Sequence, residues 1–216
     1  MLTIRQAQLD DVDAMAAVEV ASWPAPLAAS RDGIATRVET FPLGQLVATL
    51  DGVIVGTAYA QRITSRHLAQ TPATYDVVTD SGTLAGSHDS LGDVYELVGV
   101  GVSRTGHGIG IGRVLIDRQI KLARSLPGIK RIVGFTRPVR FHRHPEVSIE
   151  DYVLLRSGGG RLIDPVLSFH LDSGARLVSI HPDFRPLDTE SGGYGVLIEY
   201  PVDPTVGFSD VTVANN

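Results

Sequence analysis

Four glycines stand at alternate positions before a helical pattern, in a spacing suited to binding a phosphate group. They are Gly106, Gly108, Gly110 and Gly112. Residues 95–102 are β-branched and apolar and predict a buried strand before them, whereas residues 113–124 predict an amphipathic helix after them. Glycine frees the backbone to turn tightly, and a turn that opens a helix offers unpaired N–H donors and the positive end of the helix dipole. These features suit a pyrophosphate.

Two common phosphate motifs fit this loop less well. A P-loop needs Lys and Ser or Thr after its last glycine, and Arg113 and Val114 stand there instead. A dinucleotide-binding fingerprint fits the glycines only loosely and expects an early βαβ unit, whereas about a hundred residues precede this loop.

The run from His107 to Gly112, followed by Arg113, resembles the pyrophosphate loop of the GNAT acyltransferases, Arg/Gln-x-x-Gly-x-Gly/Ala, with His107 where Arg or Gln is usual. The resemblance implies binding of coenzyme A or a phosphopantetheine thioester. The cofactor-binding residues that it implies are Val100, Val102, His107, Gly108, Ile109, Gly110, Ile111, Gly112 and Arg113.

Segments 75–83, 164–174, 181–186 and 190–197 resemble one GNAT branch, and the likeness runs from Thr3 to about Tyr200. This branch includes the GNAT-like decarboxylase and loading domains of polyketide assembly lines, and GNAT domains fused to carbon–nitrogen hydrolases. The loading domains decarboxylate malonyl or methylmalonyl thioesters and have been assigned acyl transfer to a carrier protein. Matching their catalytic residues by order and local motif implies Trp23, Thr136, His170 and Arg185 here.

Elementary chemistry agrees with these residue types. Loss of carbon dioxide from a malonyl thioester leaves an enolate, whose oxygen needs hydrogen-bond donors. An arginine grips a carboxylate by two parallel hydrogen bonds. A histidine and a threonine hydroxyl can donate to the oxyanion, the histidine or a water can return a proton to carbon, and a tryptophan excludes water.

Two other functions remain open. In an acetyl-CoA-dependent N-acetyltransferase of a small-molecule or protein amine, Glu96 is the candidate base and Tyr194 the candidate acid. In a non-catalytic acyl-CoA-binding module, the loop binds its ligand without chemistry. The expected partners are an acyl-CoA and, as a further candidate, an acyl carrier protein.

The elements that position these residues predict an α/β fold with a mixed and mostly antiparallel central sheet flanked by helices, and the resemblance implies that this is the GNAT fold. Strands are expected at 2–8, 45–50, 53–60, 95–102, 130–136, 176–181 and 194–200. Helices are expected at 9–23, 28–40, 113–124, from Ser148 to the glycines at 158–160, and from Asp164 to Gly174. Asp51-Gly52 predicts a hairpin turn.

The domain prediction is one GNAT-like domain over residues 1–202, with an insertion at about 64–93 and a tail at 203–216 that is either an added strand or disordered. A short strand is expected at 75–78 inside the insertion.

Composition excludes several classes. The net charge is −5 without a long basic block, which argues against nucleic-acid binding. The chain has no cysteine, no long apolar run and no signal peptide, so a cytoplasmic protein without a membrane partner is expected. His142 and His144 lack nearby carboxylates of a metal site and are interpreted as part of a solvated basic turn, so no metal is expected.

Overall fold

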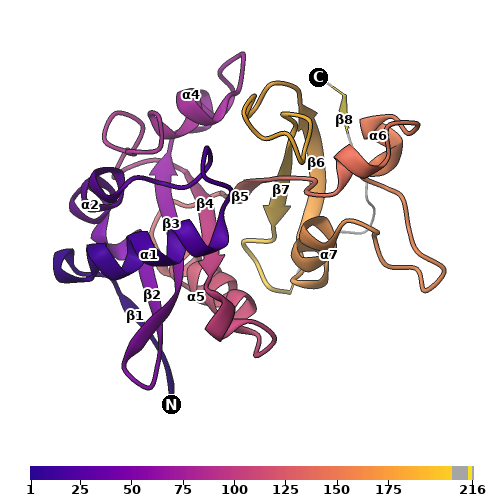
Figure 1. Cartoon of the computed structure of the whole chain (residues 1–216). Helices are drawn as coiled ribbons and strands as arrows, with labels where there is room; N and C mark the ends of the chain where they lie inside the picture. Colours follow the sequence, from indigo (N-terminus) through magenta and orange to yellow (C-terminus); the bar gives the residue numbers. More distant parts are fainter. Residues whose placement is uncertain (206–213, 216) are drawn as a thin grey trace. The chain divides into compact units, whose positions relative to one another are not determined.

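The structure is a computed structural model that describes residues 1–205 and 214–215 (Figure 1). Packing divides the chain into two compact units, Met1–Ile132 and Val133–Asn216. The first unit holds the glycine-rich loop and Trp23, and the second holds Thr136, His170 and Arg185.

The strands of the first unit form antiparallel pairs in chain order. They are β1 (Leu2–Gln6), β2 (Gln45–Leu50), β3 (Val53–Ile63) and β4 (Val94–Val102). Asp51 and Gly52 join β2 to β3, and their φ values of 49° and 85° are the positive angles that a tight two-residue hairpin turn needs. The hairpin prediction is confirmed.

A β-bulge changes which side chains of β4 share a face. Tyr59 lies opposite Gly99 and Ala60 lies opposite Leu97, so Val98 is the extra residue. Side chains alternate along a strand, and the bulge shifts that alternation by one position. Glu96, before the bulge, therefore lies on the same face of the sheet as Gly99, after it.

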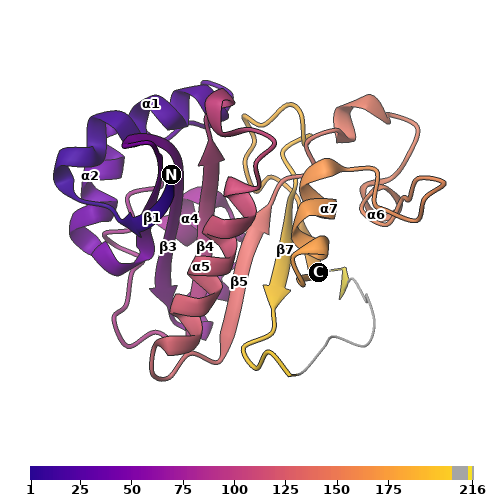
Figure 2. The same ribbon diagram turned by 90° about the horizontal axis from the view of Figure 1, so that it is seen from below.

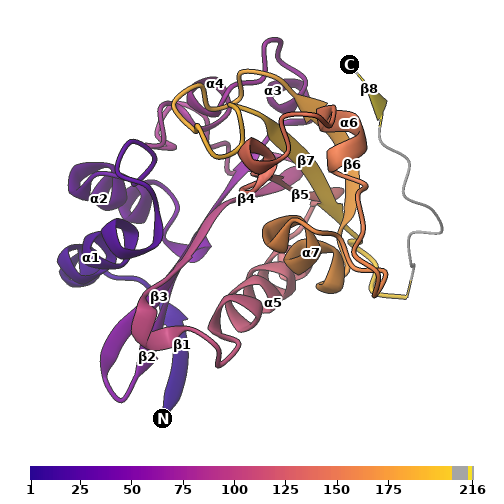
Figure 3. The same ribbon diagram turned by 45° about the vertical axis from the view of Figure 1, so that its right-hand side comes forward.

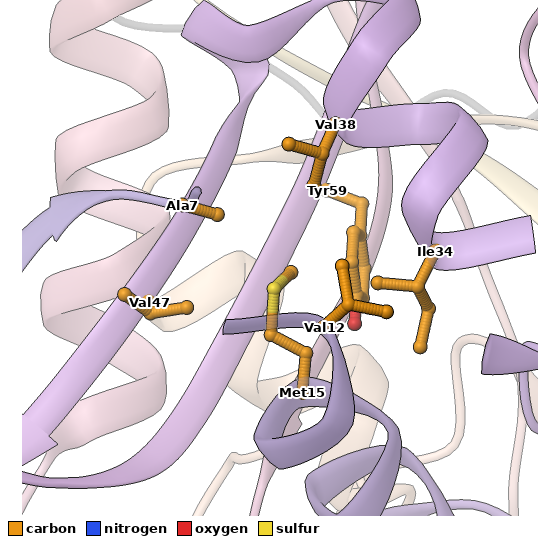
Figure 4. Packing of buried hydrophobic residues seen from close by; sticks show 7 residues of the cluster. All are labelled: Ala7, Val12, Met15, Ile34, Val38, Val47 and Tyr59. Atoms are coloured by element: carbon orange, nitrogen blue, oxygen red, sulfur yellow. The ribbon is translucent and has the colours of Figure 1, made fainter. Parts of the chain in front are cut away.

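One face of this sheet packs against α1 (Val12–Ser22) and α2 (Arg31–Thr40), which follow a 3₁₀-helix at Leu9–Asp11. Figure 4 shows the buried cluster between the sheet and these two helices. Its members are Ala7, Val12, Met15, Ile34, Val38, Val47 and Tyr59. Ser30 caps α2 by accepting the N–H of Gly33 at 3.1 Å. This cap explains why α2 begins later than the predicted residue 28.

The opposite face packs against α5 (Ile111–Ser125), as Figure 3 shows. The cluster on this side consists of Leu46, Ala48, Val55, Ala58, Ile111 and Leu115. Tyr95 is also buried, and its hydroxyl donates a 2.5 Å hydrogen bond to Gln119 Oε1 on α5. The predicted strand–glycine loop–helix sequence around residue 106 is confirmed.

Residues 64–93 contain α3 (Ser65–Leu68) and α4 (Tyr75–Thr79), and a 3₁₀-helix at Pro42–Gly44 precedes β2. The strand predicted at 75–78 is wrong, because Thr74 Oγ1 accepts the N–H of Val77 at 3.2 Å and caps a short helix there. Buried Arg37 ties this segment to α2, since its Nε donates to Gly82 O at 2.6 Å and its Nη2 to Tyr75 Oη at 3.0 Å.

In the second unit, β6 (Arg176–His181) pairs antiparallel with β7 (Gly195–Tyr200) and parallel with β8 (Ala214–Asn215). Its other elements are a 3₁₀-helix at Phe141–Arg143, α6 (Ile149–Tyr152) and α7 (Pro165–Asp172). Figure 2 shows α7 beside β7. The strand β5 (Arg131–Thr136) begins in the first unit and ends in the second.

The helix predicted from Ser148 to the glycines at 158–160 is wrong in length. Ser148 caps it as expected, with its Oγ accepting the N–H of Asp151 at 3.1 Å, but α6 ends at Tyr152. Ser157 N donates to Arg161 O at 2.8 Å, so the chain around the glycines turns back on itself instead of extending the helix.

The predicted fold class, α/β with a mixed and mostly antiparallel sheet flanked by helices, is confirmed. Of the tail at 203–216, residues 206–213 and 216 lie outside the described residues, and Ala214–Asn215 form β8. Within the described part of the chain, no helix combines the length and apolar character needed to cross a bilayer.

Candidate active site

The glycine-rich loop joins the end of β4 to the start of α5, through a 3₁₀-helix at Arg104–Gly106. Gly108 and Gly110 have φ values of 79° and 81°, which side-chain-bearing residues adopt only with strain. The first hydrogen bond of α5 runs from Val114 N to Gly110 O at 3.1 Å. The N–H groups of Ile111 and Gly112 therefore precede the first hydrogen bond of the helix and lie at its positive end.

The side chains implied as cofactor-binding divide into exposed and packed groups. His107, Gly108, Ile109, Gly110 and Arg113 are exposed, Gly112 is half-buried, and Ile111, the first residue of α5, is buried in the core against the sheet. Val100 and Val102 pack against the same apolar cluster. For Ile111, the group that remains available to a ligand is its backbone N–H.

His107 is held against the backbone of β4. Its Nε2 lies 2.9 Å from Val102 O, and a carbonyl only accepts, so Nε2 carries the proton. This geometry fixes the ring at the entrance to the loop, with Nδ1 as its second polar atom.

Glu96, the candidate base for N-acetylation, is buried in a hydrogen-bond network. Gln61 Nε2 donates to Glu96 Oε2 at 2.7 Å and to Val78 O at 3.0 Å, and Ser87 Oγ donates to Gln61 Oε1 at 2.7 Å. Burial raises the pKa of Glu96 to about 8, and the Gln61 hydrogen bond offsets only part of that rise.

Trp23 is the C-cap residue of α1 and lies over the face of β4 that carries Glu96 and Gly99. Its backbone N–H donates to Glu19 O at 2.9 Å. Its indole Cζ2 lies 3.6 Å from the position that a Cβ on Gly99 would take. The half-buried indole therefore covers the strand just after the bulge.

In the second unit, His170 lies on α7, and the start of this helix is fixed by one buried carboxylate. Asp164 Oδ1 accepts the N–H groups of Val166 at 3.0 Å and Leu167 at 3.1 Å. Its Oδ2 accepts Arg140 N and Tyr152 Oη, both at 3.0 Å. This confirms the cap predicted at Asp164-Pro165.

The His170 ring is neutral and hydrogen-bonded on one side. Burial lowers its pKa to about 4. Its Nδ1 lies 2.8 Å from Tyr200 Oη, and its ring meets that of Phe169 edge-on at 5.0 Å between centroids. With Nδ1 hydrogen-bonded to Tyr200, Nε2 is the ring atom available to bind a ligand, and no described residue is hydrogen-bonded to it.

Thr136 ends β5 with a buried hydroxyl. The residue is 6% exposed, and its Oγ1 has no hydrogen-bond partner among the described residues. A buried polar group without a partner costs free energy and calls for an explanation such as a ligand or water.

Arg185 lies in the loop between β6 and β7. Its backbone N–H donates to Gly193 O at 3.0 Å, and its carbonyl accepts Asp188 N at 2.8 Å. The loop is anchored by Arg137, which donates to Asp188 at 2.5 and 2.6 Å and to Glu190 at 2.8 Å. This ion pair holds the backbone that carries Arg185.

The sequence-based interpretation of the site missed four residues that organise it: Gln61, Arg137, Asp188 and Tyr200. Each acts through a partner distant in sequence, so no local motif identifies it. Thr136, His170 and Arg185 belong to the second unit and Trp23 to the first, and their convergence stays a prediction. In the described residues no group of histidine and carboxylate side chains could hold a metal ion, and His142 Nδ1 instead lies 3.0 Å from Glu190 O.

Comparison with known proteins agrees with this geometry. The family model described as the acetyltransferase (GNAT) family matches residues 12–144. The uncharacterized N-acetyltransferase YkwB of Bacillus subtilis (strain 168) is 30% identical over 206 residues, which are 92% of this chain and 88% of that protein.

Two solved structures are similar over almost the whole chain. The loading GNATL domain of CurA from Lyngbya majuscula has a TM-score of 0.84 and 25% identity, covering 94% of this chain and 98% of that one. The GphF GNAT-like decarboxylase in complex with isobutyryl-CoA has a TM-score of 0.78 and 36% identity, covering 93% and 100%. The extent of the family match and the identity to YkwB together show that this chain belongs to the acetyltransferase (GNAT) family.

Proposed function

We propose that this protein binds an acyl thioester of coenzyme A or of a carrier-protein pantetheine and decarboxylates a malonyl or methylmalonyl group on it. The observation that carries the proposal is the buried hydroxyl of Thr136, which has no hydrogen-bond partner among the described residues. The same unit holds His170, whose ring is fixed at Nδ1 by Tyr200. Both groups can donate a hydrogen bond to an oxyanion.

Binding of the thioester is assigned to the glycine-rich loop. The positive φ angles of Gly108 and Gly110 and the N–H groups of Ile111 and Gly112 suit a pyrophosphate at the start of α5. The similar structure of GphF contains isobutyryl-CoA, which supports the same class of ligand here.

In the proposed reaction the bond between the carboxylate carbon and the α-carbon breaks, and carbon dioxide leaves. The bonding electron pair passes to the thioester, giving an enolate whose oxygen receives hydrogen bonds from His170 and Thr136. Arg185 binds the malonyl carboxylate before it leaves. A water delivers a proton to the α-carbon and completes the reaction, with the proton replaced from the solvent, and Trp23 is assigned the exclusion of bulk water from the thioester.

An acetyl-CoA-dependent N-acetyltransferase is the second candidate, and the name of YkwB favours it. It needs a base to accept the amine proton. Glu96 is 1% exposed and its Oε2 accepts a hydrogen bond from Gln61, so the carboxylate is enclosed by protein rather than open to an incoming amine. This burial favours the decarboxylase over an N-acetyltransferase that uses Glu96 as a direct base.

Incubation of the purified protein with malonyl-CoA, methylmalonyl-CoA and acetyl-CoA tests the proposal, with products read by intact mass. We expect acetyl-CoA from malonyl-CoA and propionyl-CoA from methylmalonyl-CoA. A parallel incubation with malonyl carrier protein distinguishes the two thioester carriers. Acetylation of an added amine without loss of carbon dioxide supports the second candidate, and binding without turnover supports the acyl-CoA-binding module.

A further inference from the structure

Tyr200, at the end of β7, is the described residue that holds the His170 ring by a hydrogen bond. The two lie 30 positions apart in sequence, and Tyr200 is 1% exposed. Their rings are inclined at 68° with centroids 6.3 Å apart, so the hydroxyl meets Nδ1 at its edge rather than stacking on the ring. The 2.8 Å distance is that of an ordinary hydrogen bond.

We infer that Tyr200 is a positioning residue for His170, whose hydroxyl donates to Nδ1 and thereby fixes the ring proton on Nε2. A phenol O–H is a stronger acid than the N–H of a neutral imidazole, so the favoured direction runs from oxygen to nitrogen. The hydrogen bond at one ring nitrogen sets the protonation of the other.

The consequence is a defined donor. With Nδ1 occupied, Nε2–H is the atom that donates to the thioester oxygen, and the ring cannot turn over without losing its bond to Tyr200. This role in turnover rests on the proposed decarboxylation, whereas the tautomer itself does not depend on it.

The first arm of the test reads the tautomer directly. Two-bond ¹H–¹⁵N correlation spectra of ¹⁵N-histidine-labelled protein distinguish Nδ1–H from Nε2–H, and loss of one ring pattern in His170→Gln assigns the signals. We expect the Nε2–H pattern in the wild type and a mixture of tautomers in Tyr200→Phe. An Nδ1–H pattern in the wild type overturns the inference whatever the activity.

The second arm reads turnover of malonyl-CoA. Tyr200→Phe should lower kcat by about tenfold or more, as loss of a partner that fixes a histidine does elsewhere, with little change in KM. Tyr95→Phe is the matched control, since it removes a 2.5 Å hydrogen bond to Gln119 from another buried tyrosine, in the first unit. It should lower thermal stability and leave the His170 spectrum unchanged.

The two arms separate this inference from the proposed function. Unchanged kcat in Tyr200→Phe, in a protein that decarboxylates malonyl-CoA, overturns the positioning role. Absence of decarboxylation in the wild type contradicts the proposed function, and the tautomer assignment then stands or falls on the spectrum alone.

Discussion

Glu96 and Gln61 face each other across β3 and β4, joined by a 2.7 Å hydrogen bond from Gln61 Nε2 to Glu96 Oε2. Burial raises the pKa of Glu96 from 4.5 to about 8, so the carboxyl stays protonated in the folded protein at neutral pH. In the unfolded chain it ionises near 4.5. The free energy of unfolding must therefore fall as pH rises between these two values and level off above the higher one.

Glu96→Gln should remove this pH dependence, because its amide remains neutral at every pH. Denaturant unfolding at about pH 5 and about pH 8 should show the variant gaining stability relative to the wild type at the higher pH. Exposed Glu39→Gln is the control and should keep the wild-type dependence. Parallel pH profiles for the wild type and Glu96→Gln would contradict a protonated Glu96.

The glycine loop gives a prediction on ligand affinity. Gly110→Val places a side chain at φ 81°, which strains the loop by about 1 kcal/mol or more and moves the N–H groups at the start of α5. We expect affinity for coenzyme A to fall about tenfold, or about 1.4 kcal/mol, by calorimetry. Gly52→Val, at φ 85° in the β2–β3 hairpin, should cost similar stability without weakening binding. Equal affinities in the two variants would exclude the loop as the pyrophosphate site.

Regular elements followed from the sequence because apolar periodicity and turn residues are local signals. The capped helix α7 and the Asp51-Gly52 hairpin were predicted in this way. The short run at 75–78 was predicted as a strand because its valines favour that state, whereas the cap at Thr74 determined a helix. The bulge at Val98 could not be predicted from the sequence, because valine alternates with glycine there and glycine has no side chain to show which face of the strand it occupies. Tyr200 and Asp188 act on residues 30 and 51 positions away, beyond the reach of any local pattern.

The Arg137–Asp188 ion pair gives a prediction on stability. Burial raises the pKa of Asp188, but hydrogen bonds from Arg137 and Ser191 and the Arg137 charge outweigh this effect and bring the pKa below 3.8. Asp188→Asn should cost about 1.5–3 kcal/mol at neutral pH, since it removes the buried one of the two carboxylates, Asp188 and Glu190, that pair with the partly buried Arg137 guanidinium. Because the folded-state pKa is depressed, this difference should be present above about pH 4 and shrink as pH falls further.

Urea unfolding at neutral and acidic pH measures this difference. Asp183→Asn is the control, since Asp183 is exposed in the same loop and asparagine tolerates its φ of 53°. A loss of stability in Asp188→Asn that does not depend on pH would show that the carboxylate charge is not what stabilises the loop.

Arg185 gives a prediction on substrate choice. If it binds the malonyl carboxylate, Arg185→Ala should weaken malonyl-CoA binding by about 1.5–3 kcal/mol, the usual value of a hydrogen bond to a charged group. Acetyl-CoA lacks that carboxylate, so its affinity should hardly change. Arg185→Lys keeps the charge without the two-point geometry and should fall between the two. Equal losses for both thioesters, by calorimetry, would remove Arg185 from carboxylate recognition.

His170 gives a prediction on turnover and its pH dependence. His170→Gln should lower kcat for malonyl-CoA by about 100-fold or more, as removal of an oxyanion donor does, with little effect on affinity.

The wild-type pKa of about 4 keeps the His170 ring neutral, so kcat should show no inflection from His170 near pH 6.5. The effect of His170 on the free energy of unfolding has the opposite sign to that of a histidine paired with a carboxylate. Because folding lowers its pKa, protonation favours the unfolded chain, and the free energy of unfolding falls as pH drops from about 6.5 towards 4. Stopped assays between about pH 5 and pH 8, with unfolding measured in parallel, check both effects. If His170→Gln changes stability but retains the wild-type kcat, the ring is a packing residue and not the donor to the enolate.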